Sequence, residues 1–527
     1  VWLCLVLTLT AVPGFATPLD DYVAKPDDTY RYSVENTVHG SGPGATYTIY
    51  QVKMTSQRWR TIAEVDQPVW WHWLQIAVPD VLTNDVALLV IEGGSNRSKP
   101  SNIEPYAGML VGATGAVLAF LQQVPNQPLR FSDETIERRE DAIIAYSYDK
   151  FLNTGDPSWP LLLPMVKSAV RAMDTVQAVL RDKGVTVERF MVGGGSKRGW
   201  TTWLTAAVDK RVMACVPIVI DVLNMKVQMA HHFMAYGAYS EAVHDYVDKN
   251  VFGRFGTPEA DRLLEIVDPY QYRQRFTMPK FLINATGDEF FVLDSSRFYY
   301  DSLPGPKLLR YFPNSGHGIN ADISAAMSLV QFYSAVTKGL PLPEYSWTFG
   351  ADDSIRVQTD GTEASVALWQ ATNPAERDFR WFDGKGPQWS STPLSPVAER
   401  TYEARVDRPA RGWTAFLVEL SYPTGLVLTS EVRVVPDCLP YEDPDADGQI
   451  NRYDEDDDND GTADVKDGFP CDRDDNGVPD AYETALTGRR VERGAPRAQN
   501  TWVGLLILGG IFAGLAVAAV IILRRLT

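Results

Sequence analysis

Hydrophobic residues in the first two thirds of the chain form short continuous runs that alternate with longer segments of helical periodicity. The continuous runs, together with a tryptophan-rich stretch, predict strands at residues 70–78, 87–91, 109–111, 190–192, 216–220 and 280–284. Apolar residues at helical spacing predict helices over residues 161–181 and 201–208. Apolar strands that alternate with helices are typical of a mainly parallel sheet with both faces covered. The pattern therefore predicts an α/β domain over residues 17–342.

Two later segments break this rhythm. Residues 222–275 are helical in pattern, are rich in Met and Tyr, and fall between two predicted strands. We expect this insertion to form a cap over a site. From residue 343 to 436, short runs of alternating apolar and polar positions are separated by Pro, Gly and Asp. This second pattern predicts a small β-sandwich after the α/β domain.

A serine in a glycine-rich turn is the first candidate for chemistry. The segment 190–200 reads Phe-Met-Val-Gly-Gly-Gly-Ser-Lys-Arg-Gly-Trp, so Ser196 lies directly after a predicted strand and before a predicted helix. This is the context of a nucleophile elbow, a sharp turn that exposes the serine hydroxyl above the sheet. The usual spacing is G-x-S-x-G, whereas here Arg198 occupies the place of the last glycine and Gly199 follows it. A glycine turn that binds phosphate is the alternative interpretation of this motif.

An acid and a histidine follow in the order of an α/β-hydrolase. Asp288 comes just after the predicted strand 280–284, and His317 lies in a glycine-flanked loop after a further apolar run. The chain order Ser…Asp…His is that of the α/β-hydrolase catalytic triad. We therefore expect His317 to accept the proton of Ser196, and Asp288 to orient the imidazole and stabilise its cation.

Other residues would complete such a site. The developing negative charge of an acyl-transfer intermediate needs hydrogen-bond donors that are already in place. The predicted donors are the backbone N–H groups of Lys197, Gly94 and Ser95. Asp221, at the end of another predicted strand, is the alternative acid. Two neighbouring histidines in the predicted cap are candidates for a pair on the substrate side, namely His231 and His232.

Several blocks of this sequence resemble one protein family. In chain order, the matching blocks are 194–209, 217–224, 313–317, 377–380 and 412–416. They resemble the PhoPQ-activated pathogenicity-related proteins, and the resemblance runs over roughly residues 20–436. It implies a fold similar to the α/β-hydrolases and leaves the substrate open. The serine block is also similar to the local G-x-S-x-x-G elbow of glucuronoyl esterases.

The start of the chain and its cysteines bear on the cellular compartment. Residues 1–11 are apolar and are followed by small residues up to Ala16, which predicts a secretory signal peptide over residues 1–16; a buried first strand is the alternative. In an exported protein we expect a disulfide between Cys438 and Cys471. Cys215 lies in an apolar run and is interpreted as a buried strand residue.

The C-terminal segment predicts a membrane anchor. It is free of charge over residues 503–523, begins after Trp502 and ends before two arginines, Arg524 and Arg525. At about 1.5 Å per residue it is long enough to span a bilayer, and its basic end belongs on the cytoplasmic side. We expect a linker at 484–501, a transmembrane helix at 502–523 and a cytoplasmic tail at 524–527, with a cleaved sorting tail as the alternative. A GxxxG pair that could mediate dimerisation consists of Gly510 and Gly514.

One acidic block accounts for most of the negative charge. Residues 442–483 contain 17 acidic and 3 basic residues, a net −14 out of −18 for the whole chain. The remaining mild acidity, with 45% hydrophobic residues overall, indicates a globular body rather than a disordered chain. Since no basic stripe outweighs the acidic block, the sequence argues against nucleic acid as a partner.

The acidic block repeats one pattern three times. Carboxylate or amide oxygens recur with the spacing of calcium loops, and a glycine at the sixth position allows the sharp turn. The repeats resemble thrombospondin type 3 repeats and predict a calcium-binding stalk over residues 437–483, with a solvated acidic linker as the alternative. The predicted Ca²⁺ ligands are Asp443, Asp445, Asp447, Asn451, Asp454, Asp456, Asp458, Asp460, Asp464, Asp467, Asp472, Asp474, Asn476, Asp480 and Glu483.

Two hypotheses follow from these patterns. The first is an exported, membrane-anchored serine hydrolase that acts on an ester or peptide bond and needs no cofactor for catalysis. The second is a non-catalytic surface protein for binding or signalling that keeps the α/β-hydrolase fold as a scaffold. The departure from the usual elbow at Arg198 keeps the second hypothesis open.

Overall fold

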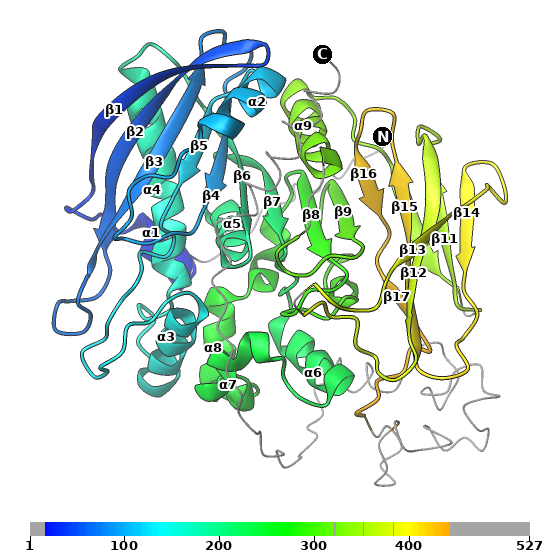
Figure 1. Ribbon diagram of the computed structural model, residues 1–527. Helices are drawn as coiled ribbons and strands as arrows, with labels where there is room; N and C mark the ends of the chain where they lie inside the picture. Colours follow the sequence, from blue (N-terminus) through cyan, green and yellow to red (C-terminus); the bar gives the residue numbers. More distant parts are fainter. Residues whose placement is uncertain (1–15, 320–322, 351, 383, 443–450, 452–527) are drawn as a thin grey trace, which may run out of the picture.

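The computed structural model describes residues 16–319, 323–350, 352–382, 384–442 and 451 (Figure 1). Several predicted features lie wholly or largely outside these residues: the signal peptide, the calcium repeats other than Asn451, Cys471, the linker, the transmembrane helix and the cytoplasmic tail. Among the described residues, no helix has both the length and the apolar character needed to cross a membrane.

A nine-stranded sheet forms the centre of the α/β domain, in the order β1-β2-β3-β5-β4-β6-β7-β8-β9 (Figure 1). Neighbouring strands are parallel from β5 to β9, while β1 to β3 form an antiparallel extension at one edge. The strands are β1 (Arg31–Gly42), β2 (Ala45–Arg58), β3 (Val69–Pro79), β4 (Val86–Ile91), β5 (Leu118–Leu121), β6 (Arg189–Gly195), β7 (Val212–Ile218), β8 (Lys280–Ala285) and β9 (Lys307–Phe312).

Helices cover both faces of this sheet, as the unbroken apolar strands predict. On one face lie α1 (Pro18–Ala24), α4 (Leu162–Arg181) and α5 (Lys197–Val208), and on the other α2 (Glu104–Thr114) and α9 (Ile323–Lys338). Alternate residues of β4 enter different cores: Leu89 and Ile91 pack with the first set of helices, and Val90 packs with α2. A strand with two buried faces has no polar side, which explains its continuous hydrophobic run.

The strand predicted at residues 109–111 is wrong, because this run lies inside helix α2. Ile103, Ala107 and Val111 are buried at a spacing of four residues, so they form one helical face against the sheet. Gly115 ends the helix in a left-handed conformation, with φ of 61°. The sequence analysis missed β5, a few residues later, and also the two edge strands β1 and β2. A three-residue apolar run does not distinguish a helix from a strand.

The regular elements of the insertion between β7 and β8 are all helices, joined by turns and short loops. It contains α6 (Met225–Tyr236), η1 (Glu241–Val243), α7 (His244–Asp248), η2 (Phe252–Arg254), α8 (Pro258–Val267) and η3 (Pro269–Arg275). Together with α3 (Asp141–Thr154), the helices of the insertion gather at one end of the sheet (Figure 1). Contacts of α3 with both α7 and α8 join the insertion to the α/β domain.

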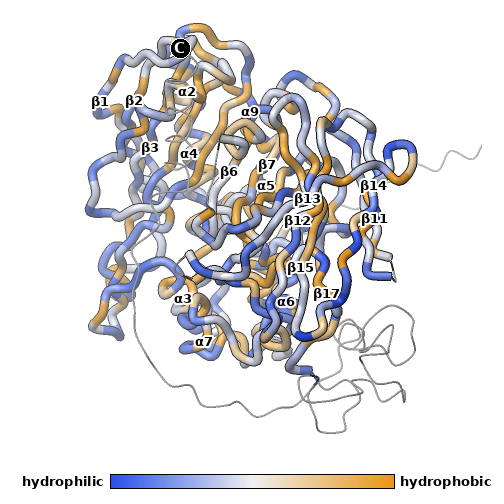
Figure 2. The backbone as a smooth tube through the Cα atoms, turned by 45° about the vertical axis from the view of Figure 1, so that its right-hand side comes forward, coloured by the Kyte–Doolittle hydropathy of each residue, from blue (hydrophilic) through white to orange (hydrophobic). Residues whose placement is uncertain are grey.

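Two antiparallel sheets follow in the segment that was predicted to form a β-sandwich. The first sheet consists of β10 (Tyr345–Phe349), β11 (Ser354–Thr359) and β14 (Thr401–Arg405). The second consists of β12 (Ser365–Asn373), β13 (Ser390–Pro393), β15 (Trp413–Ser421), β16 (Val427–Thr429) and β17 (Arg433–Val435). Their inner faces share one core with the outer strands of the large sheet, and Figure 2 shows the hydrophobic stretches along β12 and β15. The two domains are therefore packed against each other rather than loosely tethered.

Candidate active site

Ser196 lies on a sharp turn between β6 and α5. Its φ of 58° and ψ of −131° are unusual for a residue with a side chain, and such backbone strain is characteristic of functional sites. The flanking glycines are sterically required. A Cβ on Gly194 would lie 2.8 Å from the carbonyl oxygen of Arg198, and a Cβ on Gly199 would lie 2.9 Å from the carbonyl oxygen of Gly194. The geometry therefore places the second required glycine at 199, which accounts for the departure from the usual spacing.

The structure brings Ser196, His317 and Asp288 together. The Nε2 atom of His317 lies 2.8 Å from the Oγ of Ser196, and Nδ1 lies 2.9 Å from Oδ2 of Asp288. All three side chains are buried, with exposed fractions of 5%, 7% and 5% for serine, histidine and aspartate. The two contacts fit an imidazole that donates from Nδ1 to the carboxylate and accepts the serine O–H at Nε2. Each side chain follows a different parallel strand, β6, β8 or β9.

Glu289, which the sequence analysis missed, holds the histidine loop. Its Oε2 atom accepts a hydrogen bond of 2.6 Å from the backbone N–H of His317. Burial raises the pKa of this carboxyl, although the hydrogen bond opposes the increase. Next to it, the ring of Phe290 lies 4.3 Å from the imidazole, measured between ring centroids. The only signal in the sequence is that both residues directly follow Asp288.

The two basic residues after the serine are buried in ion pairs. The Nη2 atom of Arg198 donates to Oε1 of Glu140 at 2.7 Å, and its Nε donates to the carbonyl oxygen of Val124 at 2.6 Å. The Nζ atom of Lys197 lies 3.0 Å from Oε2 of Glu140 and 2.9 Å from Oδ2 of Asp141. Burial alone would raise the pKa of Glu140, but the two cations hold it well below its ordinary value. Arg198 therefore fastens the elbow to the loop before α3.

The predicted oxyanion donors lie in two backbone segments that the sheet brings together. The strands that precede them, β4 and β6, are parallel neighbours, with Ile91 paired to Gly194. Side-chain amides hold the carbonyl oxygens of the loop after β4: Gln127 donates to Gly94 at 3.1 Å and Gln123 donates to Ser95 at 2.8 Å. Within the described part of the chain, no hydrogen bond uses the backbone N–H of Lys197, Gly94 or Ser95. These three donors thus remain available.

An apolar pocket opens beside the serine, and the space between its wall atoms, open solvent included, is about 520 Å³. Its walls come from the α/β domain and from the helical insertion, which therefore covers the site as a cap. The lining residues are Asp141, Tyr148, Ser196, Lys197, Trp200, Ile220, Val222, Met225, Met229, Val243, Tyr246, Val251, Phe252, Phe290 and Phe291. A lining of this apolar character suits a small organic group next to the hydroxyl.

Asp221, the alternative acid, is hydrogen-bonded to two tyrosines. Its Oδ1 accepts from Tyr299 at 2.5 Å, and its Oδ2 accepts from Tyr311 at 2.6 Å. Burial raises the pKa of Asp221 to about 7. Since Asp288 holds the Nδ1 atom of His317, the geometry favours Asp288 over Asp221 as the partner of the imidazole.

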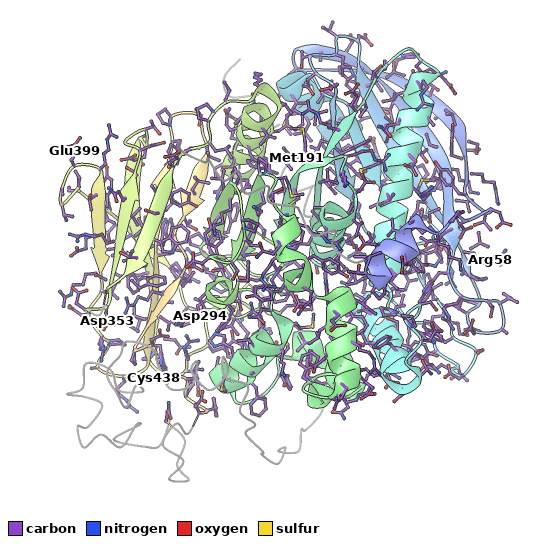
Figure 3. The ribbon with its side chains drawn as sticks, turned by 180° about the vertical axis from the view of Figure 1, so that it is seen from behind. Arg58, Met191, Asp294, Asp353, Glu399 and Cys438 are labelled. Atoms are coloured by element: carbon purple, nitrogen blue, oxygen red, sulfur yellow. The ribbon has the colours of Figure 1, made fainter. Side chains whose placement is uncertain are left out.

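The histidine pair of the cap is fully buried and does not line the pocket. His231 lies 2.8 Å from Oδ1 of Asp294 through its Nε2, and the same aspartate accepts a 2.7 Å hydrogen bond from Arg377 of the β-sandwich. The Nε2 atom of His232 accepts from the backbone N–H of Ser240 at 3.0 Å. Figure 3 shows Asp294 between the α/β domain and the β-sandwich. These contacts give the pair a structural environment rather than a position on the substrate side.

The predicted metal ligands, apart from Asn451, lie outside the described residues, as does Cys471 of the predicted disulfide. Within the described ranges, no group of three or more His, Cys, Asp and Glu side chains is arranged to hold a metal ion. Cys215 is buried in β7, in agreement with its interpretation as a strand residue.

Comparisons with known proteins identify similar sequences and structures. The sequence pattern of the PhoPQ-activated pathogenicity-related protein family matches residues 19–380, which include Ser196, Asp288 and His317. The autocrine proliferation repressor protein A of Dictyostelium discoideum is 36% identical over 472 residues, 83% of this chain and 94% of that protein. An acetyl xylan esterase from Paenibacillus sp. R4 is 17% identical, with a TM-score of 0.43, and the match covers 60% of this chain and 90% of that one. For a Pyrococcus horikoshii acylaminoacyl peptidase the identity is 12% and the TM-score 0.37, with 56% and 49% covered.

Proposed function

The chain belongs to the PhoPQ-activated pathogenicity-related protein family, and we propose that it is a serine hydrolase that cleaves an ester or peptide bond. One observation carries the proposal: the continuous hydrogen-bonded line from Ser196 through His317 to Asp288, with distances of 2.8 and 2.9 Å. A serine hydroxyl is a weak nucleophile until a base accepts its proton, and this geometry supplies that base.

The proposed reaction has two halves. As the Ser196 oxygen attacks the carbonyl carbon, Nε2 of His317 takes the hydroxyl proton, and the carbonyl oxygen becomes an oxyanion. The histidine then passes the proton to the leaving group as its bond to carbon breaks, which leaves an acyl-serine. In the second half, water attacks the acyl carbon while His317 takes a proton from it. His317 then returns this proton to the Ser196 oxygen as the acid product is released. Asp288 holds the imidazole in the required tautomer and stabilises its cation.

The oxyanion needs donors at the position where its charge develops. The backbone N–H of Lys197, at the first turn of α5, is one proposed donor. The second comes from the loop after β4, at Gly94 or Ser95, where amide side chains already fix the carbonyl oxygens. A Cβ on Gly93 would lie 2.6 Å from Nη2 of Arg198, so the buried guanidinium packs closely against the same loop.

The setting of the enzyme is part of the proposal. We propose that the body is exported and held at the cell membrane by residues 502–523, and that the acidic repeats over residues 437–483 bind structural Ca²⁺. The predicted disulfide between Cys438 and Cys471 would close a loop around most of these repeats. None of these features takes part in the chemistry at Ser196.

Hydrolysis of activated esters tests the proposal. The wild-type protein should release p-nitrophenol from p-nitrophenyl acetate, and Ser196→Ala should reduce kcat by at least about 10³-fold. Ser395→Ala is a suitable comparison, because Ser395 is exposed in the β-sandwich and has no role in the proposed site. Equal rates for Ser196→Ala and wild type would instead favour a protein that uses the hydrolase fold as a scaffold.

A further inference from the structure

The walls of the pocket beside Ser196 are almost entirely apolar. The cap contributes Met225, Met229 and Phe252, with exposed fractions of 4%, 4% and 8%. Phe290 and Phe291, from the segment between Asp288 and η4 (Ser295–Phe298), also line the pocket. These side chains are large, and two methionines can adapt to the shape of an occupant. An apolar group that enters this pocket leaves water, which favours binding.

The charged groups in the wall neutralise one another. The Nζ atom of Lys197 lies 2.9 Å from Oδ2 of Asp141, and the hydroxyl of Tyr246 donates to Oδ1 of the same carboxylate at 2.8 Å. The lysine also contacts Glu140 at 3.0 Å. A charged substrate group would therefore lose its hydration without gaining a counterion, which is costly. The pocket selects against charge.

The wall of the pocket also contains a tyrosine hydroxyl that has no hydrogen-bond partner among the described residues. This residue, Tyr148, lies on α3 with 1% of its surface exposed. Buried polar groups are nearly always paired in folded proteins, because an unpaired one costs stability. The hydroxyl oxygen has almost no accessible surface, so a ligand that pairs with it must displace neighbouring side chains; because Tyr148 lines the pocket, a polar ligand atom bound there is our candidate partner.

The position of the pocket relative to the triad indicates which part of the substrate it holds. Ser196 and Lys197 line the pocket directly, whereas the ring of Phe290 lies between the pocket and the imidazole of His317. The leaving group must reach Nε2 of His317 to be protonated, so it departs on the histidine side. The group that stays attached to the serine is then the one beside the pocket.

Building on the proposed hydrolase function, we propose that this pocket binds the acyl group of the substrate, and that this group is bulky, uncharged and largely apolar, with one hydroxyl or similar polar atom that pairs with Tyr148. Aromatic acyl groups with a phenolic hydroxyl are the simplest members of this class. In a peptide substrate, the equivalent would be an aromatic side chain next to the scissile bond.

Four methyl esters and one reversed ester test the substrate class. We expect kcat/KM to rise in the order methyl acetate, methyl butyrate, methyl 3-phenylpropanoate and methyl 3-(4-hydroxyphenyl)propanoate. The full range should be at least about 100-fold, and the phenolic hydroxyl should add about fivefold. The reversed ester, 2-(4-hydroxyphenyl)ethyl acetate, carries the same ring on the leaving group and should be a poorer substrate than methyl 3-(4-hydroxyphenyl)propanoate.

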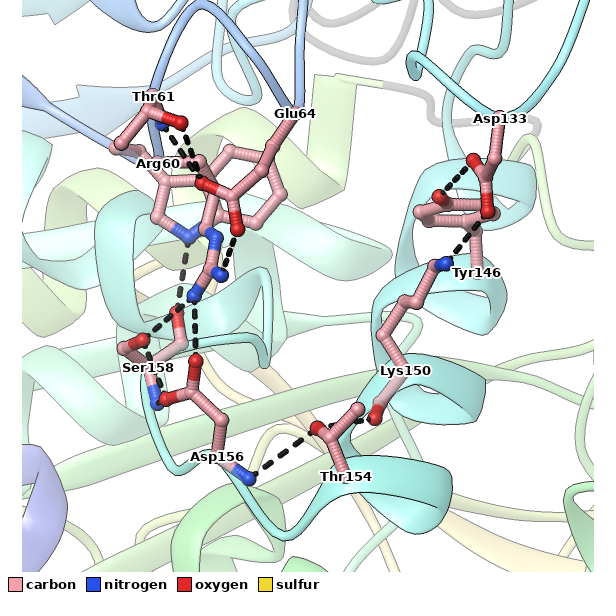
Figure 4. Close-up of polar contacts among 10 residues, drawn as sticks. Arg60, Thr61, Glu64, Asp133, Tyr146, Lys150, Thr154, Asp156 and Ser158 are labelled. Carbon is pink, nitrogen blue, oxygen red and sulfur yellow. Dashed lines mark hydrogen bonds and ion pairs between the residues drawn. The ribbon is translucent and has the colours of Figure 1, made fainter.

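Tyr148→Phe isolates the hydroxyl. This variant should lose the fivefold preference for the phenolic ester over its unsubstituted analogue, measured as the ratio of the two kcat/KM values within the same variant. Tyr146→Phe is the matched control: it lies on the same helix, does not line the pocket, and its hydroxyl donates to Asp133 at 2.6 Å (Figure 4). That control should keep the preference. Melting temperatures of both variants verify that they fold.

The outcomes separate this inference from the proposed function. If Ser196 reacts with a fluorophosphonate but methyl acetate is cleaved as fast as the bulky esters, or the reversed ester is preferred, the acyl pocket is wrong. If Tyr148→Phe retains the full preference, the role of its hydroxyl is wrong. A protein that cleaves none of the esters and does not react with the fluorophosphonate would overturn the proposed function, and this inference with it.

Discussion

At the scale of single residues, the site depends on side chains whose roles the sequence reveals to different degrees. Ser196, Asp288 and His317 could be predicted because their order along the chain and their positions after strands are diagnostic. The role of Arg198 could not, because its partner Glu140 is 58 residues away and lies on a loop with no recognisable motif. The role of Tyr148 could not be predicted either, since whether a hydroxyl has a hydrogen-bond partner depends on the packed structure.

Asp221 gives a prediction about pH at this scale. Burial, with a smaller contribution from Asp288, raises its pKa to about 7 from an ordinary value of 3.8. The folded protein therefore binds a proton here more tightly than the unfolded chain does, and this stabilisation is complete below pH 4 and is lost as pH rises to about 7. Asp221→Asn should remove that loss. Its free energy of unfolding, relative to wild type, should increase between pH 4 and 7.

Urea denaturation of Asp221→Asn and wild type at pH 4, 5.5 and 7 provides the measurement. Asp209→Asn is a control, since Asp209 pairs with Arg211 outside the site. A stability difference for Asp221→Asn that stays constant across this pH range would contradict the assigned protonation of Asp221.

At the scale of elements, the alternation of apolar runs and helical segments predicts the covered sheet, because strands with two buried faces have no polar side. It does not predict α2 and β5 correctly, since a three-residue run is compatible with both structures. The turn after β6 shows how local sequence determines the site: two glycines allow close backbone contact, and the serine takes the strained conformation between them. The loop after β9 depends on a contact that only the fold reveals, between Glu289 and the backbone of His317.

Glu289 is therefore predicted to be a positioning residue for the loop that carries His317. Glu289→Ala removes the acceptor of the His317 N–H and should lower kcat roughly tenfold, the equivalent of about one hydrogen bond, with KM little changed. Glu289→Gln keeps an acceptor oxygen and should retain most of the activity. Steady-state kinetics on p-nitrophenyl acetate measure both, and Glu265→Ala, an exposed position on α8, is the control. Equal losses in the Ala and Gln variants would mean that the charge, rather than the acceptor, matters.

At the scale of the whole molecule, a buried ionic contact joins the cap, the α/β domain and the β-sandwich. Asp294 contacts His231 of the cap on one side and Arg377 of the β-sandwich on the other, at 2.8 and 2.7 Å. The arginine and the aspartate are 0% and 1% exposed at their side chains. The two domains should consequently unfold together.

Arg377→Met tests this coupling. Removing one member of a buried ion pair typically costs about 3–5 kcal/mol. His231 and Arg297 still contact Asp294 in this variant, so we expect a loss toward the lower end of that range. Arg405→Met is the matched control, because Arg405 forms an exposed pair with Asp352 and such pairs contribute about 0–1 kcal/mol. The free energy of unfolding, measured with denaturant, should fall by this larger amount only for Arg377→Met. Calorimetry of the same variants gives an independent check. Similar losses in both variants would show that the contact does not join the domains.

The proposed calcium stalk belongs to the same scale. Residues 442–483 carry a net charge of −14, so without cations they should repel one another, and bound Ca²⁺ should stabilise them. Millimolar Ca²⁺ should raise the melting temperature of the protein, and a chelator should reverse the change. A protein truncated after Asp437 is the control and should not respond. Identical responses with and without the repeats would place any calcium effect elsewhere.

The central claim is that Ser196 is an activated nucleophile, and covalent labelling tests it most directly. A fluorophosphonate probe reacts with a serine only when a neighbouring base activates it. Peptide mass spectrometry of the labelled wild-type protein should find the probe on Ser196, and His317→Ala should lose the label although its serine is intact. Labelling at another residue, or equal labelling of Ser196 in His317→Ala, would contradict the account.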